Sequence, residues 1–301
     1  MRTGVYVQSS WLPQTLFDIF WCPLDRHMRR LCHHWIKRLH KEFTDCVQNG
    51  GAGHFTSLFG DDFGARKEKA GKELEAEARS LITAGTETSA IGVASVFFYL
   101  ARHAKAYERL ADEIRHTFSD IEQIRSGTRL TSCTYLYACI YEALRMSPPT
   151  VGCMWREVEE GGIHVDGMFI PAGYDIGSCI YALHHNENHY PDPFSYIPER
   201  WLRPSAEIEK ALRAFCPFSF GPRGCPGRSL AMLEMSIVVA RVLWLMDFRE
   251  CPDINPRSEA RAKSTEINER NKNEYQLISG VTSSSQGPLL QFKQRQLLAC
   301  E

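Results

Sequence analysis

The feature that most constrains this chain is one ten-residue stretch, Phe218-Ser219-Phe220-Gly221-Pro222-Arg223-Gly224-Cys225-Pro226-Gly227. Its three glycines and two prolines predict a loop in which the backbone bends closely around a single cysteine side chain. The stretch fits the pattern F-x-x-G-x-R-x-C-x-G at all five fixed positions. At ordinary residue frequencies, a chain of this length contains such a match by chance about once in ten thousand cases. The stretch therefore indicates a site built around Cys225.

The residues after this loop predict a helix from about Gly227 to Leu245, so Cys225 would lie just before a helix N-terminus. A thiolate is stabilised in that position by the free N–H groups and the dipole of the helix. The prediction is therefore an anionic sulfur at Cys225. The alternative is a buried, inert cysteine in a turn rich in glycine and proline.

A second motif, Ala84-Gly85-Thr86-Glu87-Thr88-Ser89, lies in a proline-free stretch from Ala65 to about His103 that predicts one long helix. Glycine inside a helix costs about 1 kcal/mol relative to alanine, which is tolerated where the missing side chain makes room for something else. The Thr88 hydroxyl can bond to the previous turn or to water, and Glu87 supplies an acid beside it. The alternative is a packing notch in a core helix.

A third motif pairs Glu142 with Arg145 at the i, i+3 spacing of a helix predicted from Thr131 to Met146. Such pairs are common on solvated helix faces, so this pair alone indicates little. The run Pro198-Glu199-Arg200-Trp201 follows it and precedes Cys225. The order of the motifs along the chain carries information that no single motif has.

In this order the motifs resemble those of the cytochrome P450 family, and the resemblance runs from about residue 12 to residue 295. It implies that Cys225 is the axial thiolate ligand of haem b, iron protoporphyrin IX. Thiolate ligation of this kind favours O–O cleavage. Arg223 and Arg156 would each bind a haem propionate as charge-assisted partners. For Arg156 the alternative is a surface arginine on a strand. Phe218 and Gly227 complete the cofactor-binding residues that the resemblance implies.

The resemblance also implies roles for the other two motifs. Glu87 and Thr88 would be the catalytic residues, which feed protons to the activated oxygen. Glu142, Arg145 and Arg200 would form a charge network that locks the loop carrying the cysteine. Removing one partner from such a network leaves an uncompensated charge.

The activity implied is that of a haem-thiolate monooxygenase, which inserts one oxygen atom from O₂ into a lipophilic small molecule. The electrons would come from a separate NADPH-cytochrome P450 reductase. The stretches Ile180–Asn186 and Pro191–Phe194 resemble fungal members that act in secondary-metabolite pathways. By the same resemblance, residues near 80–82, 150–154 and 279–282 line the substrate pocket. They are apolar or small, which suits a lipophilic ligand.

Two other functions stay open. The first is a catalytically impaired, truncated remnant of a cytochrome P450. This alternative is favoured because the part before the long helix is short compared with that of family members. The second is haem-thiolate chemistry without a reductase, such as peroxide-driven oxidation or isomerisation. The presence of both Glu87 and Thr88 favours the monooxygenase over this second alternative.

The predicted fold class is mainly α with a minor β part, the C-terminal portion of the cytochrome P450 fold, in a single incomplete domain over residues 1–301. Residues 1–60 would form a helix and linker region, residues 65–103 the long oxygen-activation helix, and residues 131–301 the remaining elements. The shorter segments expected are helices at 26–41 and 104–118, a glycine-rich linker at 49–53, β-hairpins within 158–182, and a last hairpin at 275–292 that turns at 283–287.

Charge argues against nucleic acid as a partner, because 35 Lys and Arg stand against 36 Asp and Glu and are spread along the chain. The 11 cysteines are an odd number without a C-x-x-C pair, which indicates a reducing compartment. Cys153 and Cys216 are interpreted as packing residues. The adjacent histidines at 33–34 and 184–185 lack metal-ligand spacing and are predicted to be surface or core residues.

The predicted location depends on one apolar stretch and on the resemblance. Residues 11–22 are apolar in patches but are interrupted by Gln14 and Asp18, and they fall short of the roughly 20 residues that a membrane span needs. No transmembrane helix is predicted, and the stretch is interpreted as a core or interfacial amphipathic segment. The resemblance implies association with the cytosolic face of the endoplasmic reticulum membrane, and a cytosolic location is the alternative.

Overall fold

The computed structural model describes residues 70–202, 206–251, 273–278, 282–285 and 287–295. The chain divides into two compact units, Met1–Ala84 and Gly85–Glu301, and each is described by itself. In the first unit the described part is the beginning of helix α5. The segments predicted at 1–60, which include the apolar stretch at 11–22, the histidines at 33–34 and the linker at 49–53, lie outside the described residues. The single domain over residues 1–301 stays a prediction.

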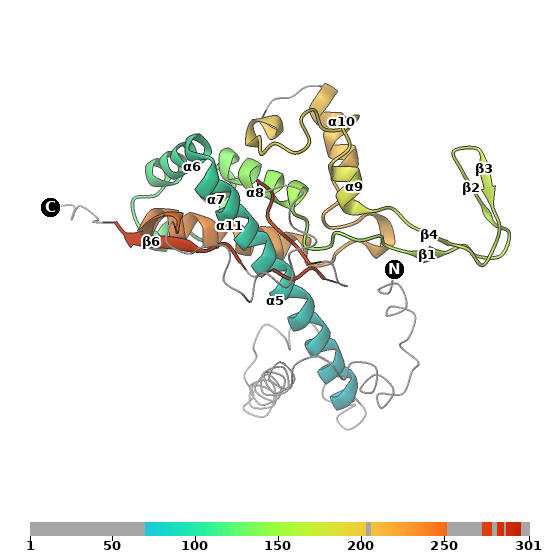
Figure 1. Cartoon of the computed structure of the whole chain (residues 1–301). Helices are drawn as coiled ribbons and strands as arrows, with labels where there is room; N and C mark the ends of the chain where they lie inside the picture. Colours follow the sequence, from blue (N-terminus) through green and yellow to red (C-terminus); the bar gives the residue numbers. More distant parts are fainter. Residues whose placement is uncertain (1–69, 203–205, 252–272, 279–281, 286, 296–301) are drawn as a thin grey trace, which may run out of the picture. The chain divides into compact units, whose positions relative to one another are not determined.

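Four long helices form the core of the described structure (Figure 1). Helix α5 spans Ala70–Arg102, and helix α6 spans Ala104–Thr117. Helix α8 spans Thr134–Met146 and ends at Ser147-Pro148-Pro149, because a residue before proline is disfavoured in helical geometry. Helix α11 spans Arg228–Leu245 and follows the cysteine loop. The four helices confirm the predicted ones, with bounds that differ by at most a few residues.

Several short helical elements connect the long ones. They are η2 Ile121–Gln123, α7 Thr128–Thr131, α9 Ile180–His184, η3 Pro198–Trp201, α10 Ala206–Ala214 and η4 Gly221–Arg223. Helix α10 was not predicted from the sequence. Its buried residues Ala211 and Ala214 pack against Tyr190.

The core forms where α5, α6, α8 and α11 pack together. Helix α6 buries one stripe, Ala106, Leu110, Ala111 and Ile114, which is typical of an amphipathic surface helix. Helix α8 differs, because ten of its 13 residues are buried, including Glu142 and Arg145. A charged side chain is tolerated in such a position only when it is paired and hydrogen-bonded.

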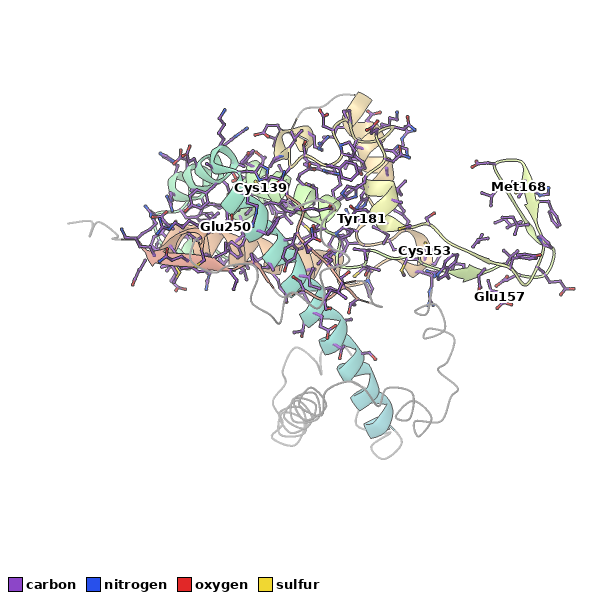
Figure 2. All side chains as sticks on the ribbon, in the orientation of Figure 1. Cys139, Cys153, Glu157, Met168, Tyr181 and Glu250 are labelled. Atoms are coloured by element: carbon purple, nitrogen blue, oxygen red, sulfur yellow. The ribbon has the colours of Figure 1, made fainter. Side chains whose placement is uncertain are left out.

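The β structure consists of small antiparallel pairs. Strand β1, Arg156–Glu157, pairs with β4, Asp175–Ile176, and β2, Ile163–Val165, forms a hairpin with β3, Met168–Ile170. Figure 2 shows Met168 on this hairpin, where its side chain is 70% exposed. The third pair joins β5, Met246–Glu250, to β6, Leu290–Gln294. The predicted class, mainly α with a minor β part, is confirmed.

The prediction of a last hairpin turning at 283–287 is wrong. Ile278 and Ser284 form an antiparallel bridge, with N–H to O distances of 2.8 and 2.9 Å, so Ser284 already lies on the returning arm. Strand β6 then pairs with β5 instead of with the segment before this turn. The reason is aromatic packing: Phe292 faces Phe248 across the pair at 5.6 Å between ring centroids, and both rings contact Phe97 of α5.

Within the part of the chain that the structure describes, no helix combines the length and the hydropathy needed to cross a bilayer.

Candidate functional site

Glu142 and Arg145 form a fully buried ion pair on helix α8. Arg145 Nε donates to Glu142 Oε2 and Arg145 Nη2 donates to Glu142 Oε1, both at 2.9 Å, and neither side chain has any exposed surface. The two parallel bonds match the planar guanidinium to the planar carboxylate. The i, i+3 spacing seen in the sequence therefore leads to a two-point contact inside the core.

The same carboxylate receives three further donors from the segment around η3. Arg200 Nε donates to Oε1 at 2.9 Å, Trp201 Nε1 donates to Oε2 at 2.9 Å, and Ile197 N donates to Oε1 at 3.0 Å. Burial raises the pKa of Glu142, but the charges and hydrogen bonds of Arg145 and Arg200 outweigh burial and hold this pKa below its ordinary value. Glu142 is therefore a buried anion with five donors.

The remaining N–H groups of Arg145 bind backbone carbonyls at the end of α9 and in the long connection after it. Nη1 donates to His184 O at 2.8 Å and to Pro193 O at 2.7 Å, and Nη2 donates to Ser195 O at 3.2 Å. Together with the two bonds to Glu142, all five guanidinium N–H groups have acceptors. Arg145 thus fixes the path of residues 184–195 as well as the charge of Glu142.

His184 extends this network to the chain that leads into the cysteine loop. Its side chain is fully buried, its Nδ1 lies 3.0 Å from Arg145 O, and its Nε2 lies 2.9 Å from Cys216 N. Because a backbone N–H can only donate, Nε2 is the acceptor, and Nδ1 carries the proton that is donated to Arg145 O. Burial lowers the pKa of His184 to about 3, against a smaller opposing effect of the bond to Arg145 O. His184 is therefore a neutral bridge between α8 and Cys216.

This bridge predicts an acid-sensitive stability. The folded pKa of about 3 lies below the ordinary value of 6.5, so the contribution of His184 is fully present above pH 6.5 and is lost as the pH falls toward 3. We expect the difference in free energy of unfolding between the parent and His184→Phe to shrink by at most about 1.4 kcal/mol per pH unit in that range. Chemical denaturation at several pH values measures it, and a difference that does not change with pH would contradict the bridge.

The cysteine loop is closed by its own backbone. Cys225 N donates to Phe218 O at 2.8 Å, and Gly224 N donates to Gly221 O at 2.9 Å across η4. Ser219 and Gly221 adopt positive φ angles of 60° and 66°, which places the chain reversal before the cysteine. The Cys225 side chain is exposed. The alternative of a buried, inert cysteine is therefore wrong.

Two glycines allow the close packing of the loop, and one of them lies beside the sulfur. A Cβ atom at Gly224 would lie 3.1 Å from Gly221 O, and one at Gly227 would lie 3.8 Å from Cys225 Sγ. Gly227 is also the N-cap residue of α11, so Cys225 lies two residues before the N-cap and three before the first helical residue, Arg228. The exposed thiol therefore lies just before the N-terminus of a long helix, and the anionic sulfur stays a prediction.

The other predicted cofactor residues lie on or near the surface. Arg223 is exposed at the end of η4. Phe218 is half-buried, packs against the core, and has the guanidinium carbon of Arg228 5.8 Å from its ring centroid. Arg156 is exposed on β1, where its Nη1 donates to Trp155 O at 2.6 Å. These positions leave both arginines open to a ligand, and their roles toward a cofactor stay predictions.

The motif on α5 contacts two other elements. Thr282 Oγ1 donates to Glu87 Oε2 at 2.8 Å, which ties the carboxylate to the last described turn. Ser89 Oγ donates to Glu234 Oε2 of α11 at 3.2 Å. Thr88 between them is half-buried, and a Cβ atom at Gly85 would meet no atom within 4 Å. The motif therefore packs against the helix that starts at the cysteine loop, with open space at Gly85.

Two members of the network were not predicted from the sequence, and only Trp201 had a local signal there. Trp201 belongs to the run that supplies Arg200, and its indole N–H could have been matched to the buried carboxylate. His184 is the first of two adjacent histidines and was predicted only as a surface or core residue. Its two backbone partners are 39 and 32 positions away in the sequence, so no local pattern indicates them.

The geometry combines an exposed thiol before a helix, a buried carboxylate–arginine network behind it, and a threonine–acid motif on the neighbouring helix. The family model described as Cytochrome P450 matches residues 5–274. The chain belongs to the cytochrome P450 family, as the three motifs predicted, and this family carries a haem iron held by a cysteine thiolate.

Among similar proteins are three fungal cytochrome P450 monooxygenases. Apf8 of Gibberella fujikuroi is 39% identical over 98% of this chain and 80% of its own length. Apf7 of the same organism is 42% identical over 75% of this chain and 43% of its own length. AtnE of Emericella nidulans is 39% identical over 74% of this chain and 42% of its own length. The chain thus spans less than half the length of two of these relatives.

Proposed function

We propose that this chain supplies the haem-thiolate site of a monooxygenase that inserts one oxygen atom from O₂ into a lipophilic small molecule, in the biosynthesis of a secondary metabolite. The observation that carries the proposal is the exposed Cys225 thiol in a loop whose entry is held by His184 and the Glu142–Arg145–Arg200 network. The names of the fungal relatives support the reaction class.

The residues present fit a haem b group. Cys225 offers one soft, exposed donor, and the glycines at 221, 224 and 227 leave room for a planar group to approach the sulfur. Cys225 Sγ would hold the haem iron, Arg223 and Arg156 would bind the propionates, and Phe218 and Gly227 would line the loop. When bound, the haem supplies the activation of dioxygen, which thiolate ligation promotes.

Glu87 and Thr88 of α5 would bind water and deliver protons. The Thr88 hydroxyl can hold one water molecule by donating to it or accepting from it, and the Glu87 carboxyl can supply a proton to that water. The hydrogen bond from Thr282 orients Glu87 and leaves one of its carboxylate oxygens available. This role would be catalytic for Glu87 and Thr88, while Thr282 would be a positioning residue.

The partners proposed follow from this chemistry. A monooxygenase of this class takes two electrons from a separate protein, here an NADPH-cytochrome P450 reductase, and we propose association with the cytosolic face of the endoplasmic reticulum membrane. A lipophilic substrate is supported by the sequence at 80–82, 150–154 and 279–282, the pocket segments that the family resemblance implies, because their residues are a mixture of apolar and small ones.

Thr88→Ala tests the proposed proton path. The variant is expected to bind haem and substrate like the parent, because a methyl group replaces a hydroxyl with little change in helix packing. More hydrogen peroxide should be released per NADPH consumed, and less product formed, in a system reconstituted with the reductase and a substrate that turns over. Thr86→Ala, two residues away on another face of the helix, is the matched control.

Three other results would redirect the proposal. Coupling that is unchanged in Thr88→Ala would make Thr88 a packing residue. Product formed with added peroxide, but not with NADPH and reductase, would favour the peroxide-driven alternative. A parent protein that holds haem and releases all its electrons as peroxide would favour the impaired alternative.

A further inference from the structure

Cys153 and Cys179 face each other across an isolated antiparallel bridge. Cys153 lies between helix α8 and strand β1, and Cys179 is the N-cap residue of α9. Both side chains are half-buried, so small molecules can reach them. Figure 2 labels Cys153 where the chain leaves the helices toward β1, and Glu157 farther out on the same arm. From the sequence, Cys153 was interpreted as a packing residue.

The register of the bridge puts the two side chains close together. The neighbouring hydrogen bond runs from Met154 N to Ser178 O at 3.4 Å, so the cysteines occupy a non-hydrogen-bonded pair of the ladder. At such pairs the Cα atoms are about 4.5 Å apart and the side chains lie on the same face. A disulfide requires Cα atoms about 4.4–6.8 Å apart. The backbone therefore needs no rearrangement before an S–S bond can form.

The surroundings of the two thiols also differ. Cys179 Sγ donates to Val151 O at 3.3 Å. Burial, together with the nearby Cys179, raises the pKa of Cys153, so its thiolate fraction grows as the pH rises above neutrality. The Cys153 thiol should therefore react faster as the pH rises.

We propose that Cys153 and Cys179 form a dithiol site that hydrogen peroxide converts to a disulfide. One thiolate attacks a peroxide oxygen, the O–O bond breaks, and hydroxide leaves with a proton as water, which gives a sulfenic acid. The second thiolate attacks the sulfenic sulfur, the S–S bond forms, and a second water leaves. Two thiols have then lost two protons and two electrons, and one peroxide has become two waters.

The bond would act on the arm that contains β1 to β4. Residues 153 and 179 are the two ends of this arm, and the strands β2 and β3 within it expose nearly all of their side chains. Cross-linking its ends would also hold residues 151–154 against the start of α9, the helix that carries His184. A nearby source of peroxide depends on the proposed function, because uncoupled oxygen activation releases it, but the dithiol itself does not.

The test uses the full chain without haem, treated with hydrogen peroxide at pH 8 and then alkylated. Mass spectrometry should find a peptide pair joined at Cys153 and Cys179, and nicking the arm by limited proteolysis should give two fragments that separate only after reduction. Cys153→Ser and Cys179→Ser should each abolish the cross-link, while Cys251→Ser, another half-buried cysteine, should retain it. Oxidation should be faster at pH 8 than at pH 6.

Full alkylation of both cysteines, under conditions that oxidise other cysteines of the chain, would overturn the proposal. A cross-link that persists in either serine variant would overturn it as well. The Cys225→Ser background separates this result from the proposed function, since the cross-link should form there although the haem ligand is gone. Failure of haem binding with an intact cross-link would count against the haem site alone.

Discussion

Replacement of Cys225 by serine is expected to abolish the spectroscopic signature of a thiolate-bound haem completely. The hydroxyl of serine is not ionised near neutral pH and is a poor ligand for the iron, so the site loses its soft anionic donor. The measurement is the absorbance of the reduced protein under carbon monoxide, in which the parent should give the strongly red-shifted Soret band of thiolate ligation. Cys251→Ser is the control, because Cys251 is a half-buried cysteine outside the loop.

A parent protein that is soluble and saturated with haem, and yet gives an unshifted Soret band, would refute Cys225 as the ligand. The same band in Cys225→Ser as in the parent would do so too. Loss of the signature in Cys251→Ser would point to general damage and not to ligation.

Glu142→Ala and Arg145→Ala are expected to lower the free energy of unfolding by about 3–5 kcal/mol each, because each leaves the other charge buried without its partner. Haem retention should fall as well, since the Arg145 guanidinium binds His184 O, and the His184 side chain accepts from Cys216 N just before the cysteine loop. Chemical denaturation of the haem-free chain and the haem content after gel filtration measure the two effects.

Arg109→Ala is a matched control for these variants. Arg109 pairs with Glu199 at 3.0 Å on the surface, where both side chains are about half exposed, and such pairs contribute roughly 0–1 kcal/mol. If Glu142→Ala or Arg145→Ala cost no more than Arg109→Ala and kept the haem content of the parent, the network would not hold the cysteine loop.

The sequence predicted those parts of the site that are local. The cysteine loop and the Glu142–Arg145 pair are defined by residues a few positions apart, and glycine, proline and helical spacing constrain such segments directly. The partners of His184 and the bond from Thr282 to Glu87 join positions 32 to 195 residues apart, and only the packed structure brings them together. These contacts could not be predicted from one sequence.

The fold shows the same division between local and distant effects. The four long helices α5, α6, α8 and α11 were predicted from the sequence, whereas the short helix α10 was missed. The pairing of the last strand, β6, was predicted wrongly. Its pairing with β5 depends on the packing of Phe292 against Phe97 and Phe248, which lie far from it in the sequence. The register of a short strand depends on which of its faces is buried, and the buried face is known only once the tertiary neighbours are known.

The acceptors of Arg145 have an evolutionary consequence. In the connection after α9, Arg145 binds the backbone oxygens of His184, Pro193 and Ser195, and every amino acid has such an oxygen. Exposed positions between them, such as Glu187 and Asn188, can therefore accumulate substitutions without loss of an arginine contact, provided that the main chain keeps its course. An insertion or deletion in the same interval would move the oxygens themselves. Natural variants of this connection should accordingly differ in composition far more than in length.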